Sequence, residues 1–286
     1  VIVQLKVSKK ARCDPMVVAE RTQQEQRAGK TVTTFEEVYF DVQAELDFTK
    51  HPGALDATNE LIDLCAIDST KHVLDVGCGV GMTPAYLVKQ TGCHVTGLDL
   101  RSSMVQRAVE RADRQELGDQ ATFVVADARF LPFQPDTFDV VMAESVFALI
   151  AEQDRAMVEC VRVVKVGGNV GIAETNWRKP PPPGFMERLS GSFGQMVYVL
   201  EPEAWQKLLE RAGLRNVVAR NHPISMRSET RGRIQRIGIR NMLRIWRRFF
   251  TIAWTQPKYR QFVKEAMSEP IELVRYWGYG VYVGQK

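Results

Sequence analysis

Short apolar segments alternate with longer amphipathic segments between residues 72 and 177, and this alternation is the strongest constraint on the fold. The longer segments have helical spacing, and they read as helices over 82–92, 102–118 and 151–168. Strands that alternate with helices predict a parallel sheet covered on both faces and wound right-handed, an α/β doubly wound fold. The short segments are rich in β-branched residues and read as strands over five ranges: 72–77, 94–100, 121–127, 138–145 and 169–177.

The alternation of strand-like and helix-like segments is interrupted on both sides of residues 72–177. The segment KPPPPG at 179–184 reads as a stiff linker, because each proline fixes φ and lacks an N–H group. The pattern then resumes with a helix and a strand, and the chain closes on an alternating segment. The expected flanking elements are polar and amphipathic helices over 16–31 and 54–68, a helix over 201–214, a strand over 216–223, a basic helical stretch over about 227–267 and a last strand over 278–286.

Composition fits a globular protein and excludes several classes. The 286 residues are 45% hydrophobic and 25% charged, which is ordinary for a soluble domain with a sizeable core. The five cysteines are scattered, with no C-x-x-C pair and no zinc spacing, so we expect free thiols and no metal site. No apolar run is long enough for a transmembrane helix, and the first ten residues lack the apolar region of a signal peptide. We therefore expect a cytoplasmic protein.

The stretch VLDVGCGVG at 73–81 joins the first strand to the following helix through three glycines. Gly77, Gly79 and Gly81 permit backbone conformations that other residues resist, and they let the main chain approach a ligand closely. The helix that begins near Met82 points its N–H groups at the same corner. A purely structural tight turn is the alternative, but the pattern favours a nucleoside-bearing cofactor.

An acid inside the first strand narrows the choice of cofactor. Asp75 lies two residues before the first glycine, where it would repel the pyrophosphate of a dinucleotide. S-Adenosylmethionine carries an ammonium group and a sulfonium cation and no phosphate, so it suits an acid at this position. The alternative is a carboxylate held by the amides of the glycine loop.

Two further acids end the next two strands. Asp99 follows Gly81 by 18 residues, near the spacing at which a carboxylate binds the ribose hydroxyls. Its alternative role, capping the helix over 102–118, is less favoured because Ser102 is available as the cap. Asp127 can accept a hydrogen bond from the adenine amine, with Ala128 leaving room for the ring, or it caps its own loop. Because the carboxyl ends of parallel strands share one edge, three acids there indicate a single ligand site.

These segments resemble class I S-adenosylmethionine-dependent methyltransferases, within the ubiquinone/menaquinone and sterol methyltransferase-like group. The resemblance implies a Rossmann-like sheet of seven strands with the last strand antiparallel, which 278–286 would supply, plus helical cap insertions. One departure is Val166, where the family usually has proline, and it should alter only a turn. The matching pieces are VLDVGCGVG (73–81), VTGLDL (95–100), VVADARFLPFQPDTFDVVMAES (124–145), VRVVKVGGNVGIAETNW (161–177) and EPEAWQKLLERAGLRNVV (201–218).

The resemblance also implies the site residues by position. Cys78 within the glycine loop reads as a small residue that donates its backbone N–H, and not as a nucleophile. In the segment at 38–53, Tyr39 would reach the methionine carboxylate and His51 would close over it, unless His51 is an ordinary surface histidine. The implied cofactor-binding residues are Tyr39, His51, Asp75, Gly77, Cys78, Gly79, Gly81, Asp99, Leu100, Met104, Asp127, Ala128, Glu144 and Ser145.

Methyl transfer from a sulfonium is an in-line displacement in which positioning supplies much of the rate, so no metal is implied. The protein must align the acceptor, exclude water and, where required, remove one proton. The sequence does not single out a base, and each candidate also has a structural reading. The candidates are His51, Glu144, Glu174, Tyr198 and His222.

The late basic stretch has ten Lys/Arg and no acid between Glu229 and Glu265. Arg236, Arg240 and Arg244 share one helical face. One reading is a solvated basic face whose apolar stripe packs on the core. The other is an interfacial helix within 231–254 that touches anionic lipid; no recognition motif for nucleic acid accompanies it. The stripe comprises Ile239, Met242, Leu243, Trp246, Phe249, Phe250 and Ala253.

We therefore expect S-adenosylmethionine-dependent methyl transfer to a small apolar acceptor, such as a quinone, a sterol-like compound or another lipid precursor. The alternatives are a polar natural-product or nucleic-acid acceptor, or a cofactor-binding module without catalysis. The expected organisation is a helical lid over 1–53, a cofactor-binding core over 54–177, a substrate-capping insertion over 178–200, a core continuation over 201–223, a basic helical insertion over 224–277 and the final strand over 278–286.

Overall fold

The computed structural model describes residues 4–5, 35–49, 51–181, 183, 198–224, 226–256, 259–260 and 276–286. The helix expected over 16–31 lies outside these residues, as does most of the insertion expected over 178–200.

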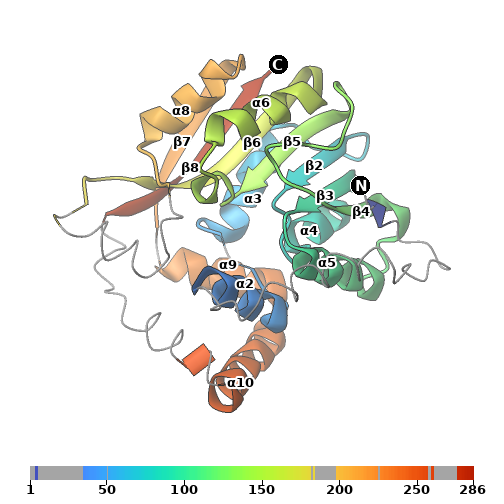
Figure 1. The fold of residues 1–286 in the computed structure, drawn as a ribbon, viewed down its shortest axis with the longest axis vertical. Helices are drawn as coiled ribbons and strands as arrows, with labels where there is room; N and C mark the ends of the chain where they lie inside the picture. Colours follow the sequence, from blue (N-terminus) through green and yellow to red (C-terminus); the bar gives the residue numbers. More distant parts are fainter. Residues whose placement is uncertain are drawn as a thin grey trace, which may run out of the picture.

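An eight-stranded sheet forms the centre of the molecule, in the order β1-β4-β3-β2-β5-β6-β8-β7 (Figure 1). From β4 to β6 all neighbours are parallel, whereas β8 runs antiparallel to both β6 and β7. The predicted seven strands with an antiparallel last strand are thus confirmed, and β1 adds a short antiparallel edge beside β4. The strands are β1 Gln4–Leu5, β2 His72–Val76, β3 His94–Asp99, β4 Ala121–Val125, β5 Phe138–Glu144, β6 Val164–Trp177, β7 Arg215–Pro223 and β8 Trp277–Gln285.

Helices cover both faces of this sheet, as the alternating sequence predicts. Because successive strand residues point to opposite faces, Val73 joins the core beneath α3, α4 and α5, and Leu74 joins the core beneath α6 and α8. The helices are α2 Phe35–Leu46, α3 Ala54–Leu64, α4 Met82–Thr91, α5 Ser102–Arg114, α6 Gln153–Val163, α8 Pro202–Arg211, α9 Met226–Ile237 and α10 Ile239–Thr255, with 3-10 turns at Gly118–Gln120 and Phe147–Leu149.

The expected helix over 151–168 is too long, because α6 ends at Val163. Val164 is already extended, with φ −76° and ψ 143°, and it pairs with Phe138 of β5. A run of β-branched valines favours the extended backbone over another helical turn. Lys165 then anchors the new strand through a 2.7 Å contact between its Nζ and Asp139 Oδ1.

Two other expectations about helix ends are also wrong. Ser102 does not cap α5; it is the first helical residue, Arg101 occupies the N-cap position, and no side chain caps that end. Gly238, with φ 74° and ψ 152°, separates α9 from α10, so Arg236 lies on a different helix from Arg240 and Arg244 and the helical face expected for all three is interrupted. A left-handed φ ends a helix at little cost only where the residue is glycine.

Helices α2, α9 and α10 gather below the strands in Figure 1, away from the layers that sandwich the sheet. The start of α9 packs on α3, where Gly232 lies against Ala54 and Glu229 accepts a 2.7 Å hydrogen bond from the N–H of Gly53. Helix α10 packs on α2 through Ile252. Within the described part of the chain, no helix is long and apolar enough to cross a membrane.

Candidate functional site

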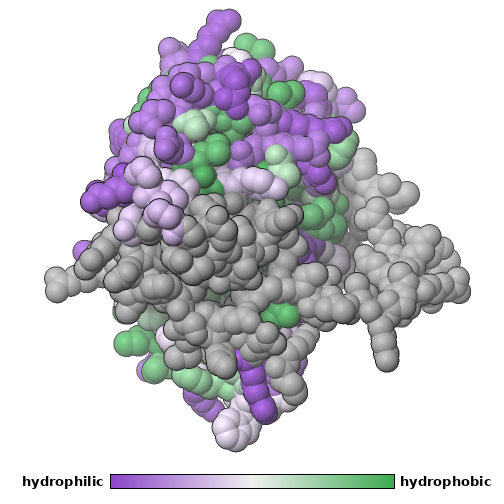
Figure 2. Space-filling view, turned by 60° about the vertical axis from the view of Figure 1, so that its left-hand side comes forward, coloured by the Kyte–Doolittle hydropathy of each residue, from purple (hydrophilic) through white to green (hydrophobic). Residues whose placement is uncertain are grey.

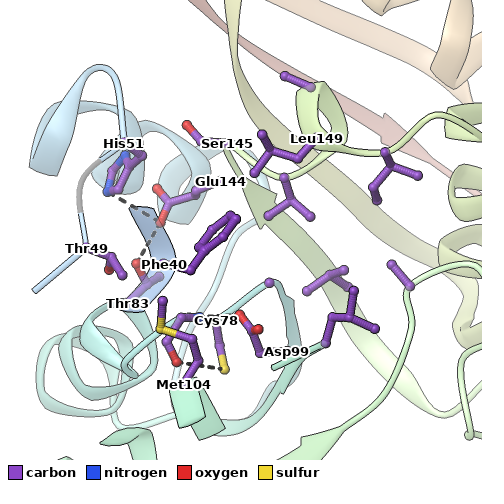
Figure 3. Close-up of a pocket in the computed structure, with 18 of the residues that line it drawn as sticks. Phe40, Thr49, His51, Cys78, Thr83, Asp99, Met104, Glu144, Ser145 and Leu149 are labelled. Carbon is purple, nitrogen blue, oxygen red and sulfur yellow. Dashed lines mark hydrogen bonds and ion pairs between the residues drawn. The ribbon is translucent and has the colours of Figure 1, made fainter. Parts of the chain in front are cut away.

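A cavity of about 460 Å³ lies at the carboxyl edge of the central strands, with α2 and the segment after it forming one wall. Figure 3 shows two groups of polar side chains in it: His51 and Thr83 both reach Glu144, and Asp99 lies beside Cys78. Every implied cofactor residue except Gly81 lines this cavity, namely Tyr39, His51, Asp75, Gly77, Cys78, Gly79, Asp99, Leu100, Met104, Asp127, Ala128, Glu144 and Ser145.

The glycine corner is shaped so that no side chain fits. Gly77, Gly79 and Gly81 all have left-handed φ values, of 72°, 54° and 76°. A Cβ on Gly79 would lie 2.8 Å from Thr49 Cγ2, and one on Gly81 would lie 2.8 Å from the Cβ of Ala108. The corner therefore needs glycine both for its backbone conformation and for close packing, and its bare backbone borders the cavity.

Asp99 connects this corner to the next strand. Its Oδ2 accepts a 3.0 Å hydrogen bond from the N–H of Gly79, and its Oδ1 accepts a 2.9 Å bond from the N–H of Arg101. Burial raises the pKa of the Asp99 carboxyl above its ordinary value, while these backbone donors oppose the shift. Each oxygen keeps a further lone pair, so the carboxylate can still accept hydrogen bonds from both hydroxyls of a ribose.

Asp127 has a different set of contacts. Its Oδ1 accepts a 2.9 Å hydrogen bond from the backbone N–H of Arg129, and the Arg129 guanidinium binds both oxygens at 2.7–3.1 Å. These hydrogen bonds hold the pKa of the Asp127 carboxyl below its usual value. The loop-capping alternative accounts for these contacts, and Asp127 and Ala128 border the cavity as well.

Cys78 lies inside the glycine loop without the features of a nucleophile. Its side chain is buried, and burial raises the pKa of the thiol well above the ordinary value. The Sγ donates a weak hydrogen bond of 3.7 Å to the carbonyl of Gly79. The thiol thus fills space beneath the loop. The Cys78 N–H donates a 2.9 Å hydrogen bond to the carbonyl of Leu98, so the donor that the resemblance assigned to the cofactor is already bonded within the protein.

Glu144 is the centre of a buried polar cluster at the end of β5. Thr58 of α3 donates to its Oε1 and Thr83 of α4 donates to its Oε2, both at 2.7 Å. His51 places Nε2 3.6 Å from the same Oε2 and Nδ1 3.4 Å from the carbonyl of Pro52. Both ring nitrogens of His51 thus face oxygen atoms of this cluster. The His51 side chain is buried and not an ordinary surface histidine.

The sequence missed both threonines of this cluster. Thr58 and Thr83 lie within α3 and α4, where nothing in the spacing indicates that their hydroxyls meet the end of β5. One weak sequence signal pointed to them: each is a threonine on an otherwise apolar helical face, and a buried hydroxyl needs a hydrogen-bond partner.

Three of the five candidate bases lie outside the cavity lining. His222 of β7 bonds Glu60 at 2.8 Å and stacks on Tyr279. The backbone N–H of Tyr198 donates to Ala148, and its side chain is partly exposed. Within the described residues, only His51 and Glu144 among the candidates border the cavity.

Glu174, the remaining candidate, anchors the loop after β5. It accepts hydrogen bonds of 2.8 Å from the N–H groups of both Val146 and Phe147. Complete burial raises the pKa of its carboxyl to about 7, against the effect of these amides. The loop begins at Ser145, whose φ of 57° is left-handed and sparsely populated for a residue with a side chain. Glu174 therefore holds a strained loop that borders the cavity.

The cavity wall away from the acids is apolar. Its side chains come from four separate parts of the chain: the 3-10 turn after β5, the segment before α8, the segment after β7 and the start of β8. These residues are Leu149, Ile150, Val199, Ile224 and Trp277. A polar corner thus faces an apolar wall across one cavity.

Comparison with known proteins decides the family. A family model described as a methyltransferase domain matches residues 74–172. An uncharacterised methyltransferase, YodH of Bacillus subtilis (strain 168), is 30% identical over 169 residues, which are 59% of this chain and 70% of that protein. The chain belongs to the class I S-adenosylmethionine-dependent methyltransferases. The fold expected from the resemblance is therefore confirmed. The cofactor of this family is S-adenosylmethionine.

Other relatives of this methyltransferase chain act on different acceptors. A phosphoethanolamine N-methyltransferase of Triticum aestivum is 32% identical over 58% of this chain and 33% of that protein. A sterol 24-C-methyltransferase of Gibberella zeae is 40% identical over 36% of this chain and 27% of that protein. The chain thus spans about a third or less of these two proteins.

Solved structures show the same fold. The [4+2]-cyclase SpnF has a TM-score of 0.69 and 21% identity, covering 88% of this chain and 97% of that one. A phosphoethanolamine N-methyltransferase of Haemonchus contortus, in complex with S-adenosylmethionine, has a TM-score of 0.66 and 21% identity, covering 90% of this chain and 58% of that one. Because a cyclase and a methyltransferase share this fold, the chemistry must be argued from the site.

The site geometry fits S-adenosylmethionine. The corner is a cradle that a Cβ would fill, and Asp99 offers half-buried carboxylate oxygens beside it. The acids Asp75 and Glu144 border the same cavity, as suits a cofactor with two positive charges and no phosphate. No group of metal-ligating side chains was found in the described ranges.

Proposed function

We propose that this chain transfers the methyl group of S-adenosylmethionine to a small apolar acceptor bound against the apolar wall of the cavity. The observation that carries the proposal is the arrangement of one continuous cavity: the glycine corner and Asp99 on one side, the apolar wall on another, and the pair Glu144 and His51 bordering it.

In this proposal the cofactor lies along the carboxyl edge of β2, β3 and β4. The backbone of Gly77 and Gly79 approaches it without interference from side chains, and Asp99 accepts hydrogen bonds from its ribose. Asp127 and Ala128 hold the adenine edge, and Leu100 and Met104 flank the ring. Tyr39 covers the other end from α2, where burial raises the pKa of its hydroxyl and keeps it neutral and able to donate a hydrogen bond.

Bound S-adenosylmethionine supplies an activated methyl group on a good leaving group, so the protein's work is alignment and proton handling. Glu144 is fixed by the two threonine hydroxyls, and it in turn holds His51 over the cavity. Where the acceptor atom carries a proton, a neutral His51 takes it and Glu144 stabilises the resulting imidazolium. The buried walls exclude water from this step.

An apolar acceptor fits the wall formed by Leu149, Ile150 and Trp277. The sterol methyltransferase relative, although matched over only part of its length, acts on a molecule of that kind by its name. An acceptor of this class partitions into lipid, so the expected peripheral membrane contact through residues 231–254 suits the proposal without being required by it.

A phosphate-bearing acceptor is the second candidate, because a phosphoethanolamine methyltransferase matches 58% of the chain. Phosphate recognition ordinarily uses arginine or lysine. Among the described residues that line the cavity, Arg101 is the one arginine or lysine, and its guanidinium stacks over the Phe40 ring at 4.3 Å. This arrangement favours the apolar acceptor.

The experiment uses S-adenosylmethionine with a radiolabelled methyl group, offered with chloroform-soluble and water-soluble cell fractions in parallel. The proposal predicts label in the chloroform-soluble product and much less with the Glu144→Gln variant. Label in the water-soluble product alone would favour the polar acceptor. Saturable cofactor binding without label in either fraction would favour a non-catalytic binding module.

A further inference from the structure

Helix α10 has an apolar stripe that is largely exposed. Ile239, Leu243, Trp246, Phe250 and Trp254 recur at intervals of four, three, four and four residues, which places them on one face of the helix. They are 53–80% exposed, far more than buried core residues. The Trp246 and Phe250 rings stack on each other with centroids 5.8 Å apart, so they form one continuous apolar surface.

A different face of α10 holds the helix on the protein. Ile252 is buried, and with the half-buried Phe249 it packs on Val38 and Val42 of α2. Arg248 adds a 3.2 Å ion pair with Glu45 of α2. The helix is therefore fixed in orientation. Of the stripe expected to pack on the core, Phe249 packs on α2 in this way, whereas Ile239, Leu243, Trp246 and Phe250 are exposed.

Three exposed arginines border the apolar stripe. Arg240, Arg244 and Arg247 lie on the helical face next to it, and none has an acidic partner within the described residues. In Figure 2, hydrophobic and hydrophilic residues lie side by side at the lower end of the molecule, where Figure 1 places α10. An apolar face bordered by basic residues is the pattern of a helix that lies in the interface of an anionic membrane.

We propose that α10 docks this chain on an anionic lipid surface, with the apolar stripe in the acyl boundary and the three arginines at the headgroups. Charge complementarity argues for lipid over a second copy of the chain, since two copies would bring six unneutralised arginines together. Helix α9 is not part of this surface at its start, where Glu229 and Gly232 are buried against the core.

The docked orientation gives an apolar acceptor a short route to the cavity. Tyr39 belongs to the α2 cluster that receives α10, and it also lines the cavity. Helix α2 thus contacts both α10 and the cavity. The inference rests on the proposed apolar acceptor for its purpose, but vesicle binding is measured without cofactor or acceptor, so the two proposals fail separately.

The test is co-sedimentation of the full chain with phosphatidylcholine vesicles, with and without phosphatidylserine. We expect binding to the anionic vesicles that weakens at high salt. The double variant Trp246→Ser/Phe250→Ser should lower the partition coefficient about tenfold or more, because half-inserted aromatic rings lose their apolar burial. The matched control is Val158→Ser on α6, an apolar side chain that is 54% exposed elsewhere, and it should bind like the wild type.

The charge contribution is tested separately with Arg240→Gln/Arg244→Gln/Arg247→Gln, which should remove most of the preference for phosphatidylserine. The control Lys89→Gln/Lys207→Gln/Arg215→Gln removes equal charge from exposed positions on other elements and should keep that preference. Absence of wild-type binding would overturn the proposal, as would equal binding by the aromatic variant. A dimer that the aromatic variant dissociates, without vesicle binding, would assign the surface to a second copy instead.

Discussion

Replacement of Asp99 by asparagine tests the cofactor assignment most selectively. The carboxylate already accepts hydrogen bonds from the N–H groups of Gly79 and Arg101 and offers its remaining lone pairs to the ribose. An asparagine amide has one acceptor oxygen, so its NH₂ group must face a backbone donor or a ribose hydroxyl. A hydrogen bond to a charged group contributes about 1.5–3 kcal/mol. We therefore expect Asp99→Asn to weaken S-adenosylmethionine binding about 10- to 100-fold.

The assay is isothermal titration of S-adenosylmethionine, with Asp119→Asn, an exposed aspartate after α5, as the control. Because burial raises the pKa of Asp99, lowering the pH protonates the carboxyl and removes an acceptor. Cofactor affinity of the wild type should therefore fall as the pH is lowered through that pKa, and Asp99→Asn should lose this dependence. Equal affinity of the wild type and Asp99→Asn would refute the ribose assignment.

Three other predictions concern buried groups. In the folded protein the pKa of Glu174 is about 7, against an ordinary 4.5, so the free energy of unfolding should fall by about 3 kcal/mol as the pH rises from 4.5 to 7. Glu174→Gln should lack this fall, as measured by urea unfolding at the two pH values. An equal fall in the variant would contradict the prediction. Cys78 should resist alkylation by iodoacetamide in the native protein, and rapid labelling would show an accessible thiolate. Glu144→Gln should lower kcat about 100-fold while Glu152→Gln leaves it unchanged; full activity of Glu144→Gln would exclude the proton-handling pair.

The sheet could be predicted from the sequence because its signals are local. The strand from His72 ends at a glycine corner, and residues 278–286 alternate as a strand does, whereas the antiparallel direction of β8 was expected from the family resemblance. The end of α6 could not be predicted from its glycines, since the competing signal was the strand preference of Val163 and Val164 and their pairing with β5. Pairing across the sheet outweighs a helix-stop signal that lies a few residues further on.

The positions of the glycine corner and Asp99 in the site could also be predicted from the sequence, because the corner is a turn after one strand and Asp99 ends the next. The cluster around Glu144 was not, since Thr58 and His51 are separated from it by more than 80 residues and meet it only through packing. His222 shows the converse: its chemistry made it a candidate base, but β7 places it against Glu60 and away from the cavity lining.

Equilibrium titration of the purified chain with S-adenosylmethionine and, in parallel, with NAD tests the central claim most directly. The bare glycine corner with Asp75, Asp99 and Glu144 around one cavity predicts saturable binding of S-adenosylmethionine, displaced by S-adenosylhomocysteine, and no binding of the phosphate-bearing NAD. Saturable binding of NAD at this corner, with none of S-adenosylmethionine, would contradict the account.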